Sequence, residues 1–365
     1  MASNVGVRRL GAAVVAMCCL AAPSSAHRAP SDAADITVVG VFGAGGVIRG
    51  AALENGYLYV ATTNSLSVYD ASNPSEPELL ATRPTPRIIH GELISTGGEL
   101  LLLNGGLVGG GLDVWNVEDK SNPVLAGSLE GIGDEHFSCL LECRWAYGSA
   151  GSVVDLRDPR MPDLSGVNWK VEIGIGESPV HRLDEYRTGF MATAPRGDPP
   201  LILDVRRPLQ PRVVARTVTS RFHPSMFLYT TWPRGGDDRF VVTSTENGGC
   251  NDEHQGALVT FDTAGWPEDG RFEVAGRYRY RGRTDDENCL AYYFSLHPRF
   301  DDGGLILLPN GLEGTRLVEV APDGTMKGLD SFVLPTSDVW LAFWVDEQIF
   351  YALNTTGEVY ILRYS

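Results

Sequence analysis

The sequence predicts an all-β protein built as a single seven-bladed β-propeller. Three observations lead to this fold. A strand–turn–strand unit recurs along the chain, no segment keeps a helical apolar period for three turns, and one β-rich strand near the beginning has no sequence neighbour to pair with. Short strands separated by Gly, Asn, Asp and Pro are typical of all-β folds. Repeats of roughly 40 to 60 residues are typical of propellers.

The repeat is clearest in Leu66–Thr82, LSVYDASNPSEPELLAT. This copy and three later ones align on the acidic or amide residue that ends the first strand of the unit. That residue is Asp70 in the first copy and Asn116, Asp155 and Asp204 in the later ones. A proline follows seven residues later in all four copies, and three copies also carry one at the fourth position. Because a proline pushes the preceding residue out of helical geometry, we interpret the unit as strand, turn, strand. Looser copies occupy residues 258–276 and 317–332.

The expected strands group into seven blades. We expect these blades at residues 48–82, 88–129, 136–173, 180–217, 222–278, 288–332 and 339–364. The seventh has only three strands, and the unpaired stretch Ile36–Phe42, ITVVGVF, supplies the fourth. We therefore expect the N-terminal strand to close the ring by pairing with the C-terminal blade, which removes two exposed sheet edges.

The first 26 residues are typical of a cleaved signal peptide. Arg8 and Arg9 form a basic start, Leu10–Ala22 is an apolar run too short for a membrane span of about 20 residues, and small residues precede His27. Residues 27–35 are polar and without periodicity, so we expect a disordered leader before a propeller at residues 36–365. The predicted location is secreted, either extracellular or periplasmic.

Composition narrows the possible partners. The formal net charge of -16 argues against nucleic acid and against anionic membrane surfaces. No stretch after residue 26 is long and apolar enough to predict membrane insertion. The expected product is an exported monomer with a strongly solvated surface.

Four cysteines remain after the predicted signal peptide, an even number that favours two disulfides in an oxidising compartment. Cys139 and Cys143 lie on either side of a tight turn and can meet locally, with a redox-active pair as the alternative. Cys250 falls in the loop between the second and third strands of blade five, and Cys289 begins the innermost strand of blade six. These two therefore lie on one face of adjacent blades, where a disulfide would hold the long loop.

The repeated strands LSVYD, LDVWN, SVVDL and LILDV resemble those of the bacterial LVIVD-repeat family. The segments HFSCLLECRWAYGS, FHPSMFLYTTW and GLILLPNGLEGTRLVEV are similar to an exported subgroup of it. The resemblance covers residues 36–365 and implies a β-propeller. It does not imply one activity, because members of the family share the fold and not an assigned chemistry.

Four histidines fall at the beginning of innermost strands, in four consecutive blades: His90, His136, His181 and His223. Innermost strands line the channel of a propeller, so these rings would converge on one rim, here called the channel-mouth face. Imidazole nitrogens arranged in this way can hold a divalent transition metal. The competing interpretation is a polar channel lining bridged by water. Glu246 is the candidate general base or partner that orients a histidine.

Other residues are expected to form the rim of a ligand site on the same face. They are Arg49, Asn288, Tyr292, Arg316 and Trp340. Arg316 can equally pair with an acidic residue between blades. Serine-nucleophile, phosphate-loop, dinucleotide-binding and HExxH motifs are absent from the sequence.

Two functions from different classes follow from these patterns. The first is an exported binding or scaffold propeller that recognises a small molecule, glycan or protein at the channel-mouth face. The second is a metal-dependent enzyme, an oxidase, a polysaccharide lyase or a hydrolase, with a four-histidine axial site. The sequence leaves it open whether the protein is an enzyme.

Overall fold

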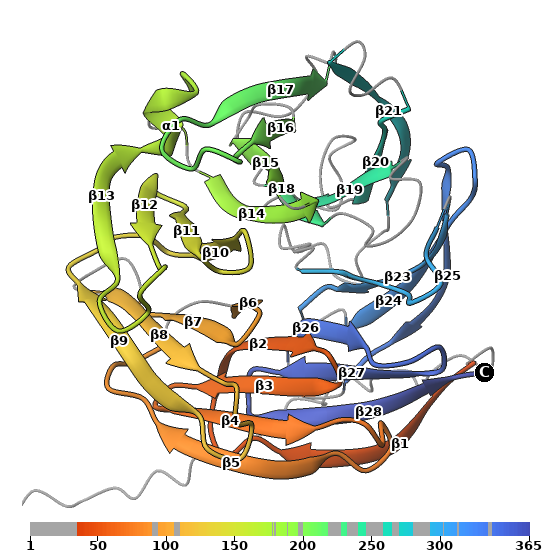
Figure 1. Cartoon of the computed structure of the whole chain (residues 1–365). Coiled ribbons are helices and arrows are strands. Elements are labelled where there is room, and N and C mark those ends of the chain that lie inside the picture. The colour runs from red at the N-terminus through yellow and green to blue at the C-terminus, as the bar shows by residue number, and fades with distance from the viewer. Residues whose placement is uncertain are drawn as a thin grey trace, which may run out of the picture.

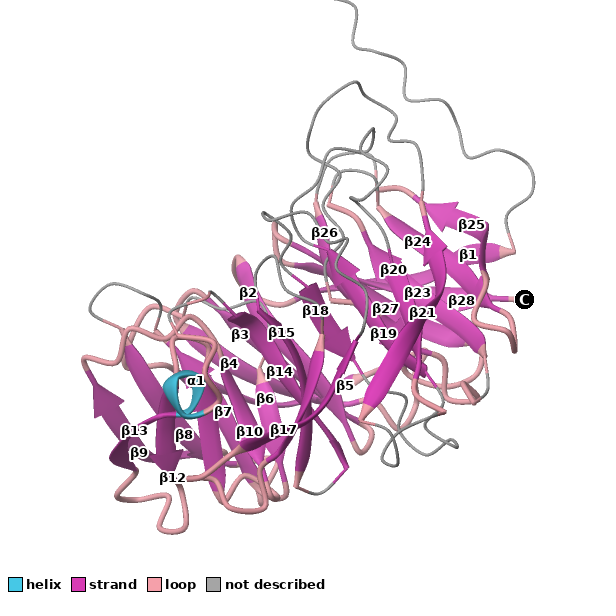
Figure 2. Cartoon of the chain, turned by 90° about the horizontal axis from the view of Figure 1, so that it is seen from above, coloured by secondary structure: helices cyan, strands magenta, loops and turns pink. Residues whose placement is uncertain are grey.

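The computed structural model is a ring of four-stranded blades around a central axis (Figure 1). It describes residues 35–89, 94–105, 110–176, 178, 180–187, 189–195, 200–217, 228–231, 240–245, 258–264, 270–279, 293–301, 303–311, 314–334 and 338–365. Strands make up almost all the regular structure of these residues, as the view in Figure 2 shows. This arrangement confirms the predicted all-β, seven-bladed propeller.

The first four blades follow one another along the chain. Blade one consists of β2 (Ile48–Glu54), β3 (Tyr57–Thr62), β4 (Ser65–Asp70) and β5 (Glu78–Pro84). Blade two consists of β6 (Ser95–Gly97), β7 (Leu100–Asn104), β8 (Gly111–Asn116) and β9 (Val124–Glu130). Blade three consists of β10 (Phe137–Leu140), β11 (Trp145–Gly148), β12 (Ser152–Asp155) and β13 (Asp163–Asn168). Blade four consists of β14 (Val180–Arg187), β15 (Phe190–Pro195), β16 (Leu201–Asp204) and β17 (Arg212–Thr217).

The remaining blades complete the ring. Blade five consists of β18 (Leu228–Thr231), β19 (Phe240–Thr245), β20 (Leu258–Asp262) and β21 (Arg271–Tyr278). Blade six consists of β22 (Ser295–Leu296), β23 (Gly304–Pro309), β24 (Thr315–Val320) and β25 (Met326–Phe332). Blade seven consists of β26 (Val339–Trp344), β27 (Ile349–Asn354), β28 (Glu358–Tyr364) and, from the N-terminal part of the chain, β1 (Ile36–Gly43).

The ring is closed by the pairing that the sequence predicts. β1 runs antiparallel to β28, with Ile36 opposite Tyr364 and Phe42 opposite Val359. Strand β1 is therefore the outermost strand of blade seven, and the C-terminal strands β26, β27 and β28 supply the other three. Ile36 packs in the apolar layer between blades six and seven, so the closing strand also buries side-chain surface.

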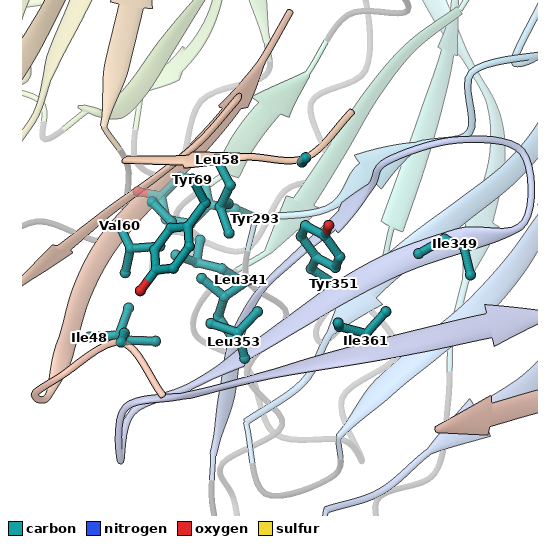
Figure 3. Close-up of a cluster of buried hydrophobic side chains, with 14 residues drawn as sticks. Ile48, Leu58, Val60, Tyr69, Tyr293, Leu341, Ile349, Tyr351, Leu353 and Ile361 are labelled. Carbon is teal, nitrogen blue, oxygen red and sulfur yellow. The ribbon is translucent and has the colours of Figure 1, made fainter. Parts of the chain in front are cut away.

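The core is divided into seven apolar layers among the described residues, one between each pair of neighbouring blades. Figure 3 shows the layer between blades seven and one, where Tyr69 and Leu58 of blade one face Tyr351 and Leu353 of blade seven. Since both sides of a blade are covered, central strands such as β27 are buried at every position. This explains why these strands are continuously apolar in sequence rather than alternating.

The two faces of the ring differ in their connections. Each innermost strand begins at the channel-mouth face, and the loop between second and third strands returns there, as between Pro309 and Thr315. The first hairpin and the repeat turn lie on the opposite face. Residues 71–77 form the repeat turn of blade one, between the third strand β4 and the outermost strand β5.

Two features differ from the sequence prediction. Blade three ends in a short helix, α1 (Trp169–Glu172), which Asn168 caps by accepting from two backbone N–H groups. Trp169 is buried and stacks on Tyr147, so the helix covers the end of the blade. β17 and β21 are also joined by a short parallel pairing, Arg216 opposite Arg271, which merges blades four and five into one eight-stranded sheet.

Candidate functional site at the channel-mouth face

The structure places several of the predicted site residues where innermost strands begin. Arg49 is the second residue of β2, Trp340 the second of β26 and His181 the second of β14, while His136 directly precedes β10. Arg316 lies near the channel-mouth end of β24, a third strand, and is half-buried. The roles of all five as ligands stay predictions.

The second residue of three innermost strands lies in a β-bulge. Arg49 is the extra residue between Ile48 and Gly50, which pair with consecutive residues of β3. Trp340 occupies the same place in β26, and His181 shares a bulge with the next residue in β14. A bulge changes the direction of a side chain relative to the regular pleat. The side chains of Arg49 and Trp340 are therefore displaced from the regular pleat at the channel-mouth face.

His136 lies in the channel. Its ring centroid is 6.3 Å from that of Tyr293 of blade six, with an interplanar angle of 72°, and its residue is only 6% exposed. Blades three and six are not neighbours, so the two rings meet across the axis. Tyr293 bridges to Leu341 of blade seven and belongs to the apolar layer shown in Figure 3. The sequence analysis did not single out Tyr293 and proposed its neighbour, Tyr292, for the rim.

Hydrogen bonds from two blades fix the segment that carries His136. The Ser149 hydroxyl accepts from the backbone N–H groups of Glu135, at 3.0 Å, and His136, at 3.2 Å. The Asn104 amide of blade two donates to the carbonyl of Asp134 at 2.9 Å and to that of Glu135. Such fixed backbone geometry is what a binding or metal site needs, because the ring does not have to be ordered by its ligand.

Asp134 is a buried carboxyl that sequence reasoning did not single out. It accepts from the backbone N–H of Ala150 at 2.5 Å, and burial raises its pKa above the ordinary range. The space it occupies exists because residue 148 is glycine: a Cβ at Gly148 would lie 2.1 Å from an Asp134 carboxylate oxygen. Asp134 therefore holds the loop after β11 against the segment that leads to His136.

A recess lies between the starts of β2 and β26. Arg49 and Trp340 line it together with Asn354 and Thr355 of the loop after β27, and Ile48 and Leu353 form its apolar wall. About 200 Å³ between and in front of these residues is free of protein atoms, a figure that includes the open solvent at the mouth of the recess. The recess is therefore too small to enclose a large molecule.

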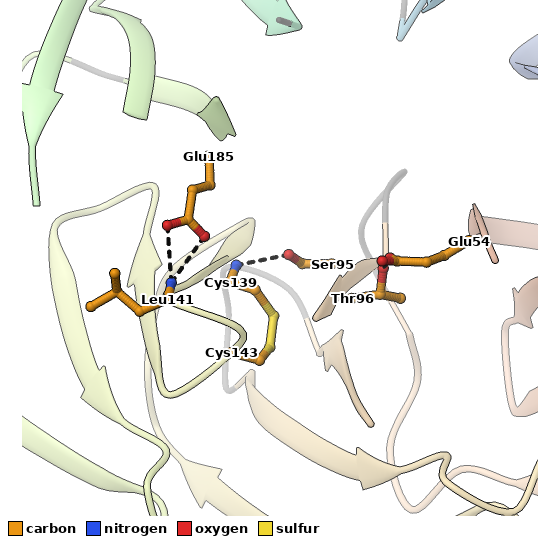
Figure 4. Close-up of a disulfide and its surroundings, with 7 residues drawn as sticks. All are labelled: Glu54, Ser95, Thr96, Cys139, Leu141, Cys143 and Glu185. Atoms are coloured by element: carbon orange, nitrogen blue, oxygen red, sulfur yellow. Dashed lines mark hydrogen bonds between the residues drawn. A yellow bond between two sulfur atoms is a disulfide. The ribbon is translucent and has the colours of Figure 1, made fainter. Parts of the chain in front are cut away.

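The opposite face carries the predicted disulfide Cys139–Cys143, which closes the first hairpin of blade three (Figure 4). Leu141, Glu142 and Cys143 all have positive φ, an unfavourable conformation for residues other than glycine. The Glu185 carboxylate of blade four accepts from the Leu141 N–H, at 2.9 and 3.1 Å to its two oxygens. The bond and the carboxylate together hold this turn.

Several predicted residues lie outside the described part of the chain. They are His90, His223, Glu246, Cys250, Asn288, Cys289 and Tyr292. The side chain of His181 is likewise not described. Among the described residues there is no group of three or more His, Cys, Asp or Glu side chains that could hold a metal ion. The same residues contain no helix long and apolar enough to cross a membrane.

Residues 45–83 match the family model of the LVIVD repeat. This stretch contains the strands of blade one, apart from the last residue of β5. The chain carries an LVIVD repeat. The match confirms the resemblance that the repeated strands indicated, at the copy where the repeat is clearest. No curated protein matches the sequence.

Solved structures similar to this LVIVD-repeat protein are propellers. One is a chain of a mitotic checkpoint complex, at a TM-score of 0.63 and 13% identity, covering 90% of this chain and 96% of that one. Another is the β-propeller domain of Cps50 (Swd1) from Myceliophteria thermophila, at a TM-score of 0.66 and 9% identity, covering 90% of this chain and all of that one. At such identities the likeness shows the fold alone.

Proposed function

We propose that this LVIVD-repeat propeller is a binding or scaffold protein that recognises a small molecule, glycan or protein at its channel-mouth face. The observation that carries the proposal is that His136 and Tyr293 meet across the axis on the face where the bulged residues Arg49 and Trp340 line a recess. Aromatic, cationic and imidazole side chains gathered on one face are typical of ligand sites.

The opposite face supports the proposal by contrast, because its hairpins are occupied with holding the blades together. The Thr96 hydroxyl of β6 donates to Glu54 of β2, and the Cys139 N–H of β10 donates to the Ser95 hydroxyl at 2.8 Å. With the Glu185 contact described above, these bonds link the innermost strands of blades one to four (Figure 4). Polar groups already paired within the ring contribute little to binding a partner.

A ligand screen with variants on each face tests this proposal. The purified protein is screened against glycan and metabolite panels, together with the variants His136→Ala and Tyr293→Leu. Arg157→Ala is the matched control, because Arg157 is exposed beside a repeat turn of the same blade as His136. Ligands of the wild-type protein should be lost in the channel-mouth variants and kept in the control. Ligands lost only in Arg157→Ala, or kept in all variants, would contradict the proposal.

The second candidate is a metal-dependent enzyme that uses His90, His136, His181 and His223. What favours it is that His136 faces the axis, as a ligand would. A divalent transition metal would there act on a bound substrate as a Lewis acid. Elemental analysis of protein purified without a histidine tag decides the matter. Near-stoichiometric metal that disappears in His136→Ala would support this function, whereas metal far below one ion per chain would exclude it.

We also propose that the protein is exported, on the basis of the basic start and apolar run of residues 8–22. N-terminal sequencing of the mature protein should then begin at His27. A mature protein that retains Met1 would contradict export by this signal.

A further inference from the structure

We propose that the recess formed by Arg49 and Trp340 is a subsite for a carboxylate joined to an apolar group. The proposal rests on the proposed function and names the chemistry of one part of that face. It is carried by three properties of the recess: an arginine whose buried Nε–H has no acceptor, its place in a bulge at the start of β2, and an apolar wall beside it.

Arg49 has no partner among the residues that the structure describes. Its side chain forms no hydrogen bond or ion pair with them, and its Nε–H is buried without an acceptor. Elsewhere the chain pairs such a group: Arg87, whose side chain is 14% exposed, binds both Asp113 and Glu130. A buried donor left without an acceptor carries a free-energy cost, because it has lost its hydrogen bond to water. A ligand that supplies the acceptor removes this cost.

Arg49 lines the recess from a bulge in the backbone of β2. Ile48 and Ala51 both belong to the layer between blades seven and one, although they are three residues apart. Regular alternation would put residues at an odd spacing on opposite sides, so the bulge at Arg49 restores the packing of Ile48. Trp340 is set in the same way between Val339 and Leu341. Both side chains are thus presented by rigid strands rather than by loops.

The polar groups of Asn354 and Thr355 beside Arg49 already form hydrogen bonds within the protein. Arg49 is therefore the principal donor that the recess offers to a ligand. The Asn354 amide donates to Glu358 at 2.9 Å and its oxygen accepts from the Glu358 N–H. The Thr355 N–H donates to the carbonyl of Asp338 at 3.1 Å. Although Asp338 directly precedes β26, no ion pair joins it to Arg49.

The shape and charge of the recess select the ligand. A guanidinium offers two parallel N–H donors, which match the two oxygens of a carboxylate. Ile48, Leu353 and the Trp340 ring provide an apolar surface for the group next to it. The net charge of -16 disfavours a dianion such as phosphate more than a monoanion. At physiological ionic strength the field of distant charges is screened beyond about 8 Å, so the nearby guanidinium decides local binding.

The carboxylate can belong to a free organic acid or to the C-terminal residue of a peptide, and the experiment separates these sources. Arginine Nε–Hε resonances are followed by NMR while 4-methylpentanoate, N-acetyl-leucine, the neutral N-acetyl-leucinamide or inorganic phosphate is added. One resonance should shift to saturation with N-acetyl-leucine, with 4-methylpentanoate, or with both, but not with the amide or phosphate. That resonance should be missing in Arg49→Met.

The variants complete the test. Affinity for the carboxylate should fall at least about tenfold in Arg49→Met, because a charge-assisted pair of hydrogen bonds is lost. It should be unchanged in the control Arg363→Met, which alters an exposed arginine on β28. Without ligand, Arg49→Met should melt at the same temperature as the wild type or higher, since an unpaired donor is removed.

Equal binding of acid and amide, unchanged affinity in Arg49→Met, or a clear loss of stability in that variant would overturn the proposal. Ligands that depend on His136 and Tyr293 but not on Arg49 would overturn this subsite alone and leave the proposed function intact. Loss of the wider proposal would instead appear as ligands insensitive to all the channel-mouth variants.

Discussion

At the scale of single residues, the repeat is explained by one hydrogen bond. In blades one to four, the residue that ends the third strand accepts, through its side-chain oxygen, from the backbone N–H two residues later. This bond measures 2.8 Å at Asp70, 2.9 Å at Asn116, 3.0 Å at Asp155 and 3.1 Å at Asp204. Asp and Asn suit this place because their short side chains form such turns. The repeated residue is therefore selected for the backbone turn and not for chemistry.

Asp204 adds an electrostatic consequence that can be measured. Hydrogen bonds from Arg206 are the main cause that lowers its pKa to about 2. A depressed carboxyl pKa contributes stability above the ordinary value of about 4, and this contribution is lost as pH falls toward 2. Because Arg206 and Arg212 are 61% and 73% exposed, water screens much of it, and we expect about 1 kcal/mol.

The Asp204→Asn variant keeps the turn and removes the charge. The unfolding free energy, measured in urea, should fall for both proteins as the pH is lowered from about 5 to about 2. The fall should be about 1 kcal/mol smaller for Asp204→Asn than for the wild type. Asp70→Asn is the matched control, since Asp70 occupies the same place in blade one without an arginine partner among the described residues. An identical acid dependence for Asp204→Asn and the wild type would disprove the effect.

The register of the repeats predicted which residues of the candidate site begin an innermost strand, and it predicted no more of the site than that. The register placed His136, Arg49 and Trp340 at the start of innermost strands, where the structure has them. It could not reveal the bulges, because a bulge depends on which residues of the next strand are paired. The burial of Asp134 was equally hidden, since it depends on the missing Cβ of Gly148 in another strand.

At the scale of elements, the repeat turns of blades one, three and four pack against the preceding blade. The Tyr147 hydroxyl of β11 donates to the carbonyl of Pro208 in the turn of blade four at 2.5 Å. Tyr351 of β27 does the same to Pro74 of blade one, at 2.9 Å. A Cβ at Gly127 of β9 would lie 2.4 Å from the carbonyl of Pro159 in blade three. The turn prolines thus mark a contact between blades as well as a change of direction.

Tyr147→Phe tests this contact. Tyr147 is fully buried, so removing its hydroxyl leaves the Pro208 carbonyl without its donor while the ring still packs on Trp169. We expect a loss of about 1 to 2 kcal/mol in the unfolding free energy measured in urea. Tyr360→Phe is the control, because the Tyr360 hydroxyl bonds an exposed Glu358 and should cost little. Equal effects of the two substitutions would show that the buried contact contributes nothing.

Elements that break the repeat were the ones that sequence could not predict. The helix α1 has only four residues, too few for a helical period to be visible. Its position depends on the stacking of Trp169 on Tyr147 and on the indole N–H of Trp169, which donates to the Gly148 carbonyl at 2.8 Å. The parallel pairing of β17 with β21 likewise joins outermost strands that no pattern in either strand relates.

At the scale of the whole molecule, the number of blades and the closure of the ring could be predicted by counting repeat copies and strands in the sequence. Four registered copies, two looser ones and a final half copy gave seven blades, and the unpaired β1 fitted the missing strand. The seven apolar layers follow from this count, since each blade covers its neighbours on both sides. The closing layers depend on strands from opposite ends of the chain.

This closure makes the β1–β28 seam the place where a covalent bond should stabilise the ring most. Every blade is joined to the next by continuous chain, but β1 is held to β28 only by hydrogen bonds and packing. Thr37 and Arg363 are direct partners across this seam and both are exposed, so replacing them costs little packing. A disulfide there encloses nearly the whole chain, for which the chain-entropy model gives about 6 kcal/mol.

The double variant Thr37→Cys, Arg363→Cys should therefore melt at least about 5 °C above the wild type, even after some loss to native-state strain. Peptide mapping must show the intended bond, because Cys139 and Cys143 form a disulfide of their own. Thr37→Cys alone is the control and should melt with the wild type. If the mapped bond forms and the melting temperature does not rise, the ends of the chain are not what limits unfolding, and separation of the blades elsewhere in the ring must come first.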